Sequence, residues 1–154
     1  MKRHIILRVA AKALIPLIIL LAFYVQFHGD YGPGGGFQAG VILAAAVVLY
    51  ALIFGLDAAR AAVPERSVRF FLSFGVLLYA GVGIATLLKG GVYLDYNVLD
   101  SHGDAVHGQH LGILLVEAGV GITVTAAMLT IFYAFADRAH VAMREREEAE
   151  EGGQ

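Results

Sequence analysis

The sequence predicts an all-α membrane protein with four transmembrane helices and both termini in the cytoplasm. Of its 154 residues, 58% are hydrophobic and only 16% are charged, and the mean hydropathy is +0.72. Soluble domains carry about a quarter charged residues. The charges gather at the two ends and in two loops, which leaves long apolar runs between them. The distribution of Lys and Arg over the loops then sets the orientation.

Four segments reach the length of about 20 residues that crosses a hydrocarbon core about 30 Å thick. They are residues 9–27, 37–56, 70–88 and 111–136. The first contains Lys12 and Pro16, the second carries no charge, and the fourth contains Glu117. The N-terminus could pass for a signal peptide, but the apolar run continues to Phe27 without a small-residue cleavage site. We therefore expect an uncleaved first helix.

A glycine-rich stretch, residues 28–40, separates the first two helices. Five glycines and a proline in residues 28–36 exclude a stable helix interior. The stretch is either a tight hairpin or an interrupted helix that lines a cavity. Since the first helix is complete at Phe27 and the second needs residue 37 onward, the break falls at the outer boundary. This favours a tight outer turn that leads into a packing face of Gly36, Gly40 and Ala44, with a cavity-lining role only where partner subunits cover it.

Basic residues in short loops mark the cytoplasmic side of a membrane protein. Ten of the eleven Lys and Arg residues fall on one predicted side, against Lys89 alone on the other. The ten are Lys2, Arg3, Arg8, Lys12, Arg60, Arg66, Arg69, Arg138, Arg144 and Arg146. Four helices with both termini cytoplasmic satisfy this bias.

The remaining segments are an inner connector, a polar outer loop and a charged tail. The connector is residues 57–69, and the outer loop is residues 89–110. The tail is rich in Glu and lacks aromatic residues, which is typical of a fraying helix end followed by disorder. We therefore expect a transmembrane domain over residues 1–140 and a disordered cytoplasmic tail over residues 141–154.

Glu117 is the first candidate for chemistry, because an ionisable side chain inside an apolar span is a functional hypothesis by default. Counted from Leu111, it lies about 9 Å along the helix, in the outer third. His110 lies two turns earlier on about the same face, so the two residues are candidates for a proton or cation path. The alternative is a glutamate that is hydrogen-bonded between helices for packing alone.

Two further ionisable residues are candidates for the ion or proton path. Lys12 lies near the cytoplasmic end, where a long cationic side chain usually extends to the headgroups; otherwise it contacts a partner subunit or an internal carboxylate. Histidine side chains in general titrate near working pH, so His28 can relay protons, or it can be an interfacial residue wetted by headgroups. The sequence favours neither role for His28.

Several functions are excluded by what the sequence lacks. Without cysteine there is no disulfide, thiolate metal site or cysteine catalysis. The spacing of His102, His107 and His110 matches no metal template, and residues 34–36 lack the context of a phosphate cradle. No nucleophile–base pair stands out, and the charge is not basic enough for nucleic acid. We expect no metal, no cofactor and no catalysis by this chain alone, and its small residues at helical spacing indicate a subunit of a larger assembly.

The motif Phe-His-Gly-Asp at residues 27–30, followed by Gly-Pro-Gly-Gly-Gly-Phe-Gln-Ala-Gly at residues 32–40, resembles the signature of the MnhB/MrpB-like subunits of the multisubunit Mrp/Mnh-type cation/proton antiporters. The likeness extends over most of residues 5–136. It implies a bacterial inner-membrane complex that exchanges protons for Na⁺ or K⁺, with large proton-translocating subunits and small membrane subunits as partners. By position it suggests His28, Pro33, Phe37 and Glu117 as functional residues, and Gly34, Gly35, Gly36 and Gly40 as motif and packing residues.

From the residues and the resemblance we expect a subunit that contributes to assembly and, further, to the ion path. The alternative is a purely structural subunit in the membrane arm of a related respiratory or hydrogenase-type complex.

Overall fold

The computed structural model describes residues 5–29, 32–99 and 105–151. Its helices are α1 (Ile5–Phe27), α2 (Gly36–Phe54), α3 (Leu56–Ala62), α4 (Glu65–Leu88), a short 3₁₀ helix η1 (Tyr96–Leu99) and α5 (Ala105–Glu151). The described residues contain no strand. Helices α1, α2, α4 and α5 are long and apolar enough to cross a membrane. The predicted all-α fold with four spans is confirmed, whereas the side on which the termini lie stays a prediction.

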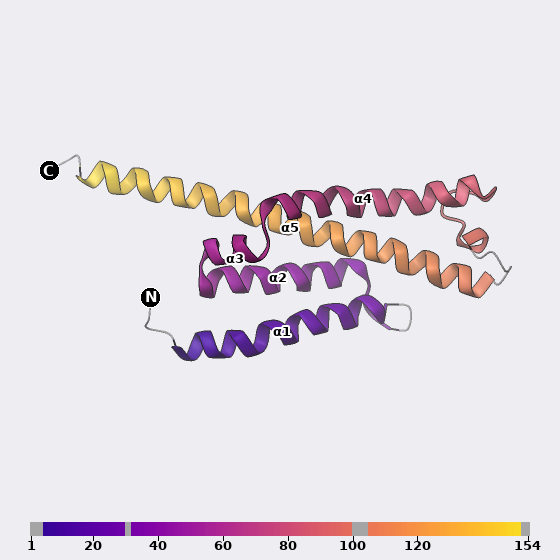
Figure 1. The fold of residues 1–154 in the computed structure, drawn as a ribbon, viewed down its shortest axis with the longest axis horizontal. Helices are drawn as coiled ribbons and strands as arrows, with labels where there is room; N and C mark the ends of the chain where they lie inside the picture. The colour runs from indigo at the N-terminus through magenta and orange to yellow at the C-terminus, as the bar shows by residue number, and fades with distance from the viewer. Residues whose placement is uncertain (1–4, 30–31, 100–104, 152–154) are drawn as a thin grey trace.

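The four long helices stand in a row in the order α1, α2, α5, α4 (Figure 1). Helix α1 packs on α2, and α5 is the central helix because α2 and α4 both pack against it. Measured along the helix axes, the start of α1, helix α3 and the start of α4 lie toward one end of the bundle, while the end of α1, the start of α2 and η1 lie toward the other (Figure 1). The alternation of helix direction therefore brings the basic start of α1 and the basic inner connector to the same end.

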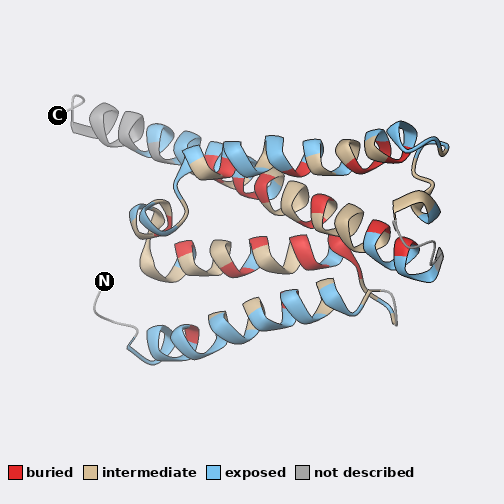
Figure 2. Ribbon diagram, turned by 45° about the vertical axis from the view of Figure 1, so that its right-hand side comes forward, coloured by how far each residue is buried: buried red, intermediate tan, exposed pale blue. Residues whose placement is uncertain are grey.

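Small residues determine how closely α2 approaches α5. Gly36, Gly40 and Ala44 are all buried, and they share one face of α2. A Cβ on Gly40 would lie 2.7 Å from the carbonyl oxygen of Gly121 on α5. Lipid offers no hydrophobic reward for helix association, so this close packing has to supply it. This face of α2 is the one that packs against α5, and most of the buried residues lie along α2, α4 and α5 (Figure 2).

Helix α5 carries a second glycine face that packs against α4. A Cβ on Gly119 would lie 3.0 Å from the backbone nitrogen of Tyr79, and Gly75 of α4 faces α5 in turn. Two glycine faces on opposite sides of one helix explain how α5 holds a neighbour on each side. Toward the end of the bundle where α4 begins, a buried core is formed by Ala44, Val68, Ala126, Leu129 and Tyr133.

Helix α1 begins at Ile5 rather than at residue 9, and larger differences from the sequence-based boundaries follow along the chain. Helix α3 contains the last residue of the expected second span, Leu56, together with residues 57–62 of the expected connector, and it follows Gly55 at φ 102°. Helix α4 begins at Glu65 rather than at residue 70. Helix α5 begins at Ala105 and continues to Glu151, past the expected end of the span at residue 136 and into the stretch expected to be a tail. Backbone hydrogen bonding does not stop at the membrane surface, so hydropathy underestimates these helices. The division of the chain at residue 140 stays a prediction.

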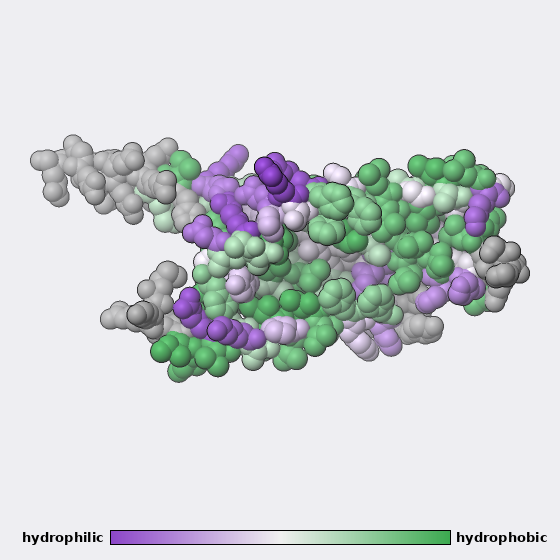
Figure 3. All heavy atoms as spheres, in the orientation of Figure 1, coloured by the Kyte–Doolittle hydropathy of each residue, from purple (hydrophilic) through white to green (hydrophobic). Residues whose placement is uncertain are grey.

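A polar cluster at the end of the bundle where α1 begins joins α3 to α4 and α5. Arg60 of α3 forms ion pairs with Glu65 of α4 and Asp137 of α5. The hydrogen bond with Asp137 raises the pKa of Arg60, so the guanidinium stays charged. The hydroxyl of Tyr133 donates to the carbonyl oxygen of Val63 at 3.0 Å. Polar atoms gather at this end, while hydrophobic side chains cover most of the remaining visible surface (Figure 3).

The outer loop is anchored on glycines of the helices. The ring of Tyr96 lies where a side chain on Gly112 would be, and the ring of Tyr93 does the same at Gly83. Thr86 is fully buried; its hydroxyl accepts a hydrogen bond from the backbone of Leu94 at 2.9 Å. Burial raises the pKa of the Tyr96 phenol. This loop therefore packs as part of the fold over residues 89–99.

Candidate functional site

Glu117 lies at the level where α1 ends and α2 begins. It is half-buried on α5, and its side chain points at the connection between α1 and α2. A Cβ on Gly29 would lie 2.7 Å from Oε2 of Glu117, and a Cβ on Gly35 would lie 3.0 Å from Oε1. The carboxylate is therefore held against the backbone of the glycine-rich turn, which lies far from it in the sequence.

Glycine is required in this turn because of both conformation and space. Gly35 has φ 137°, a value that side chains with a Cβ rarely adopt, and it directly precedes α2. At Gly36 a Cβ would overlap the backbone carbonyl of Glu117. A side chain at either position would push the turn away from α5. The glycines thus let the backbone of the turn and the carboxylate of Glu117 come into contact.

The carboxylate of Glu117 is surrounded by the N-terminal end of α2 and by polar backbone and side-chain atoms. Gly35 is the N-terminal flank of α2, where no side-chain cap bonds the free backbone N–H groups. The N-terminus of a helix carries a partial positive charge that stabilises a nearby anion. Gln38, in the first turn of α2, places its Oε1 3.7 Å from the position of a Cβ on Gly35. The helix N-terminus stabilises the ionised form of the carboxylate, and the carboxylate together with the neutral oxygen atoms can bind a proton or a small cation.

The other predicted ion-path residues lie at different distances from this site. His28 is exposed at the end of α1, where its ring stacks on Tyr24 with centroids 4.9 Å apart. His110 is exposed on α5, seven residues before Glu117 and about 10.5 Å away along the axis. Lys12 is exposed on α1, in the half of that helix opposite the turn. The structure thus places His28 in the turn that Glu117 contacts and keeps Lys12 away from it.

Some residues of the predicted motif are exposed, and others pack against α1 or α5. Pro33 and Phe37 are exposed, so they are not part of the packed core. Gly34 lies against α1, since a Cβ there would be 3.1 Å from the carbonyl oxygen of Val25. Gly40 accepts a hydrogen bond at its carbonyl from the hydroxyl of Thr125 at 3.1 Å. The predicted turn is therefore a structural unit with α5.

Gln26 is not among the site residues predicted from the sequence. Its side chain lies against α5, with Oε1 2.6 Å from the position of a Cβ on Gly121, one turn after Glu117. Its Nε2 is buried and has no hydrogen-bond partner among the described residues. The signal in the sequence was present, because Gln26 is an amide inside an apolar run near the glycine motif.

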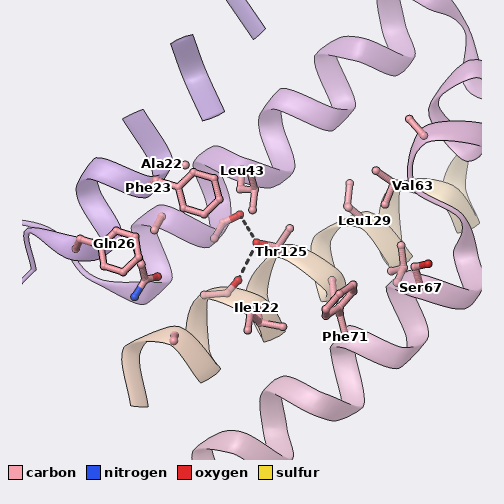
Figure 4. Close-up of a pocket in the computed structure, with 18 of the residues that line it drawn as sticks. Ala22, Phe23, Gln26, Leu43, Val63, Ser67, Phe71, Ile122, Thr125 and Leu129 are labelled. Carbon is pink, nitrogen blue, oxygen red and sulfur yellow. Dashed lines mark hydrogen bonds between the residues drawn. The ribbon is translucent and has the colours of Figure 1, made fainter. Parts of the chain in front are cut away.

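Gln26 also stands at one end of an apolar groove of about 750 Å³ between α1, α2, α4 and α5. Val63 and Ser67 lie at the opposite end, and Phe23, Leu43 and Phe71 form its walls (Figure 4). This apolar lining gives an ion no ligands along most of the groove. No group of three His, Asp or Glu residues able to hold a metal ion lies within the described ranges. His102 of the outer loop falls outside those ranges.

The family model and the related proteins that match this chain point to the same family. The family model described as "Domain related to MnhB subunit of Na+/H+ antiporter" matches residues 6–130, which include both the glycine-rich turn and Glu117. The B-type subunit of the Na⁺/H⁺ antiporter of Bacillus subtilis (strain 168) is 30% identical over 92 residues, which cover 60% of this chain and 64% of that protein. Its counterpart from Alkalihalophilus pseudofirmus is 28% identical over 128 residues, which cover 78% of this chain and 88% of that protein.

Proposed function

Because the chain belongs to the family related to the MnhB subunit of Na⁺/H⁺ antiporters, we propose that it works inside a multisubunit complex that exchanges protons for Na⁺ or K⁺. The chain is a multi-pass bacterial membrane protein and a transporter subunit rather than a catalytic enzyme. Other antiporter subunits are its partners. In our proposal they include large proton-translocating subunits and small membrane subunits, in the bacterial inner membrane. The alternative, a structural subunit of a respiratory or hydrogenase-type complex, is not favoured by these matches.

Within this complex, the chain contributes a protonatable carboxylate at the outer side of the membrane. Glu117 binds either a proton or a cation, and the two compete for the same oxygen atoms. Carbonyl groups that the glycine turn leaves outside regular helices supply further oxygen ligands, as broken helices do in secondary transporters. Hard cations prefer such oxygen ligands. His28, in the same turn, is the neighbouring group through which a proton reaches or leaves the site.

The observation that carries this proposal is the contact between the carboxylate of Glu117 and the glycine turn. A glutamate needed only for packing would be expected against small residues of a neighbouring helix interior. This one instead lies against Gly29 and Gly35, at the N-terminal end of α2. There it reaches both the helix dipole and non-helical backbone. The position is also close enough to the outer ends of α1 and α2 to exchange ions with that side.

The test is the variant Glu117→Gln in the complete antiporter, assayed as Na⁺- or K⁺-dependent proton movement in inverted membrane vesicles. We expect assembly to persist and exchange to be lost, because the amide cannot take up and release a proton. Asp57→Asn is the matched control: it removes one carboxylate on α3, and exchange should continue. Full exchange by an assembled Glu117→Gln complex would remove Glu117 from the ion path and leave the chain a scaffold.

A further inference from the structure

Gln26 is a polar side chain in the last two turns of α1 that faces α5. We propose that Gln26 is a positioning residue for Glu117: its side-chain amide donates a hydrogen bond to the ionised carboxylate and so sets the pH at which the site releases its proton. This inference rests on the proposed function of Glu117. It concerns a residue outside the family motif at residues 27–40.

The side-chain amide of Gln26 and the carboxylate of Glu117 lie near each other, between the end of α1 and α5. Gln26 lies on Gly121, and Gly121 follows Glu117 by one helical turn on the same face of α5. On the other side, Gly29, which touches the carboxylate, follows Gln26 by three residues. Residues one turn apart have Cβ atoms about 5–6 Å from each other, so a change of side-chain rotamer is enough to join the two groups.

The side-chain amide of Gln26 lacks a hydrogen-bond acceptor for its N–H groups among the described residues. The Nε2 atom is buried as well. A buried donor without a partner is destabilising, and replacing it by an apolar group of the same shape is close to neutral or stabilising. Packing alone would therefore be served as well by Met at this position. A carboxylate is the acceptor that a neutral amide donor bonds most strongly, and Glu117 supplies it when ionised.

Several titratable groups lie on the helices around Glu117. Helix α2 contributes none near the site, since its tyrosine, Tyr50, lies toward the opposite end. The cations of α1 lie in the half of that helix away from the turn. The groups nearer to the site are Tyr24 of α1, His28 of the turn, Tyr79 of α4 and His110 of α5. Gln26 differs from all of these because it is a donor that does not itself titrate.

The experiment measures the pH profile of cation/proton exchange in inverted vesicles that contain the complete antiporter. The variants are Gln26→Met, which keeps the length and removes the donor, and Gln26→Asn, which keeps an amide. Ser67→Ala is the control, because it removes a polar group from the other end of the groove. Without the donor, the ionised carboxylate of Glu117 is less stable relative to its protonated form. Gln26→Met should therefore shift the pH profile of exchange to higher pH by about 1–2 units, which corresponds to a 10- to 100-fold higher proton affinity of Glu117. Gln26→Asn should shift it less, and Ser67→Ala should leave it in place.

The outcomes separate this inference from the function on which it rests. If Gln26→Met assembles with an unshifted profile while Glu117→Gln abolishes exchange, Gln26 does not position the carboxylate and the proposed function stands. If Gln26→Met lowers the amount of assembled complex without a shift of the profile, Gln26 is a packing residue and the inference is also wrong. If Glu117→Gln exchanges normally, the proposed function itself fails.

Discussion

Replacing Gly36 by Ala tests whether the approach of α2 to α5 builds the site. The added methyl group would overlap the backbone carbonyl of Glu117, and both residues belong to helices that cannot give way locally. Overpacking costs about 1–3 kcal/mol, and we expect the upper part of that range because the obstacle is backbone rather than a flexible side chain. A loss of about 3 kcal/mol lowers the equilibrium constant for the packed helices by roughly 100-fold or more. Less complex should therefore assemble.

The control is Gly81→Ala on α4, where a Cβ would meet nothing within 4 Å. It makes the same chemical change and should be neutral or stabilising by up to about 1 kcal/mol, the difference in helix propensity. Gly34→Ala should fall between the two, because its Cβ would lie 3.1 Å from the carbonyl oxygen of Val25. The assay is co-purification with a tagged partner subunit and thermal melting of the purified complex. If Gly36→Ala co-purifies and melts like Gly81→Ala, the close contact of the two helices is not required.

Three further predictions concern the packing and the orientation of the chain. Thr125→Val removes the hydrogen bond from the Thr125 hydroxyl to α2. It should lower the melting temperature of the complex slightly, because hydrogen bonds between helices in membranes average about 0.6 kcal/mol. Thr125→Ser should keep the hydrogen bond and the melting temperature. Gly112→Ala should displace the ring of Tyr96 and open the outer loop to a protease that leaves the native loop intact. In this cysteine-free chain, Arg66→Cys should react with a membrane-impermeant thiol reagent only from the cytoplasmic side and Lys89→Cys only from the outside; the reverse labelling would overturn the predicted orientation.

Hydropathy and glycine content were sufficient to predict the main elements of the fold. Four long apolar runs predicted the four spans, and the glycines of residues 28–36 predicted the break between α1 and α2. The spacing of Gly36, Gly40 and Ala44 predicted a packing face without indicating which helix it meets. That partner is α5, because α5 has glycines of its own at the matching height. Periodicity within one helix contains no information about the register of another.

The same limit explains what could not be predicted at the site. Glu117 and His110 share a face of α5 by their spacing, which suggested them as a pair. The structure instead places the carboxylate of Glu117 against Gly29 and Gly35, residues more than 80 positions earlier in the chain. Gln26 joins this group only through its contact with Gly121. Contacts between helices that arise from glycine-sized gaps depend on backbone positions, and a single sequence does not encode these explicitly.

The central claim, that the carboxylate of Glu117 takes up a proton or a cation in turn, is open to direct measurement. Infrared difference spectra of the assembled complex, recorded with and without Na⁺ or K⁺ at fixed pH, detect the carbonyl-stretch band of a protonated carboxylic acid. We predict that this band decreases when the cation is added and that the change is missing in Glu117→Gln. An unchanged difference band in Glu117→Gln would assign the exchange to a carboxyl group other than that of Glu117 and contradict the role proposed for it.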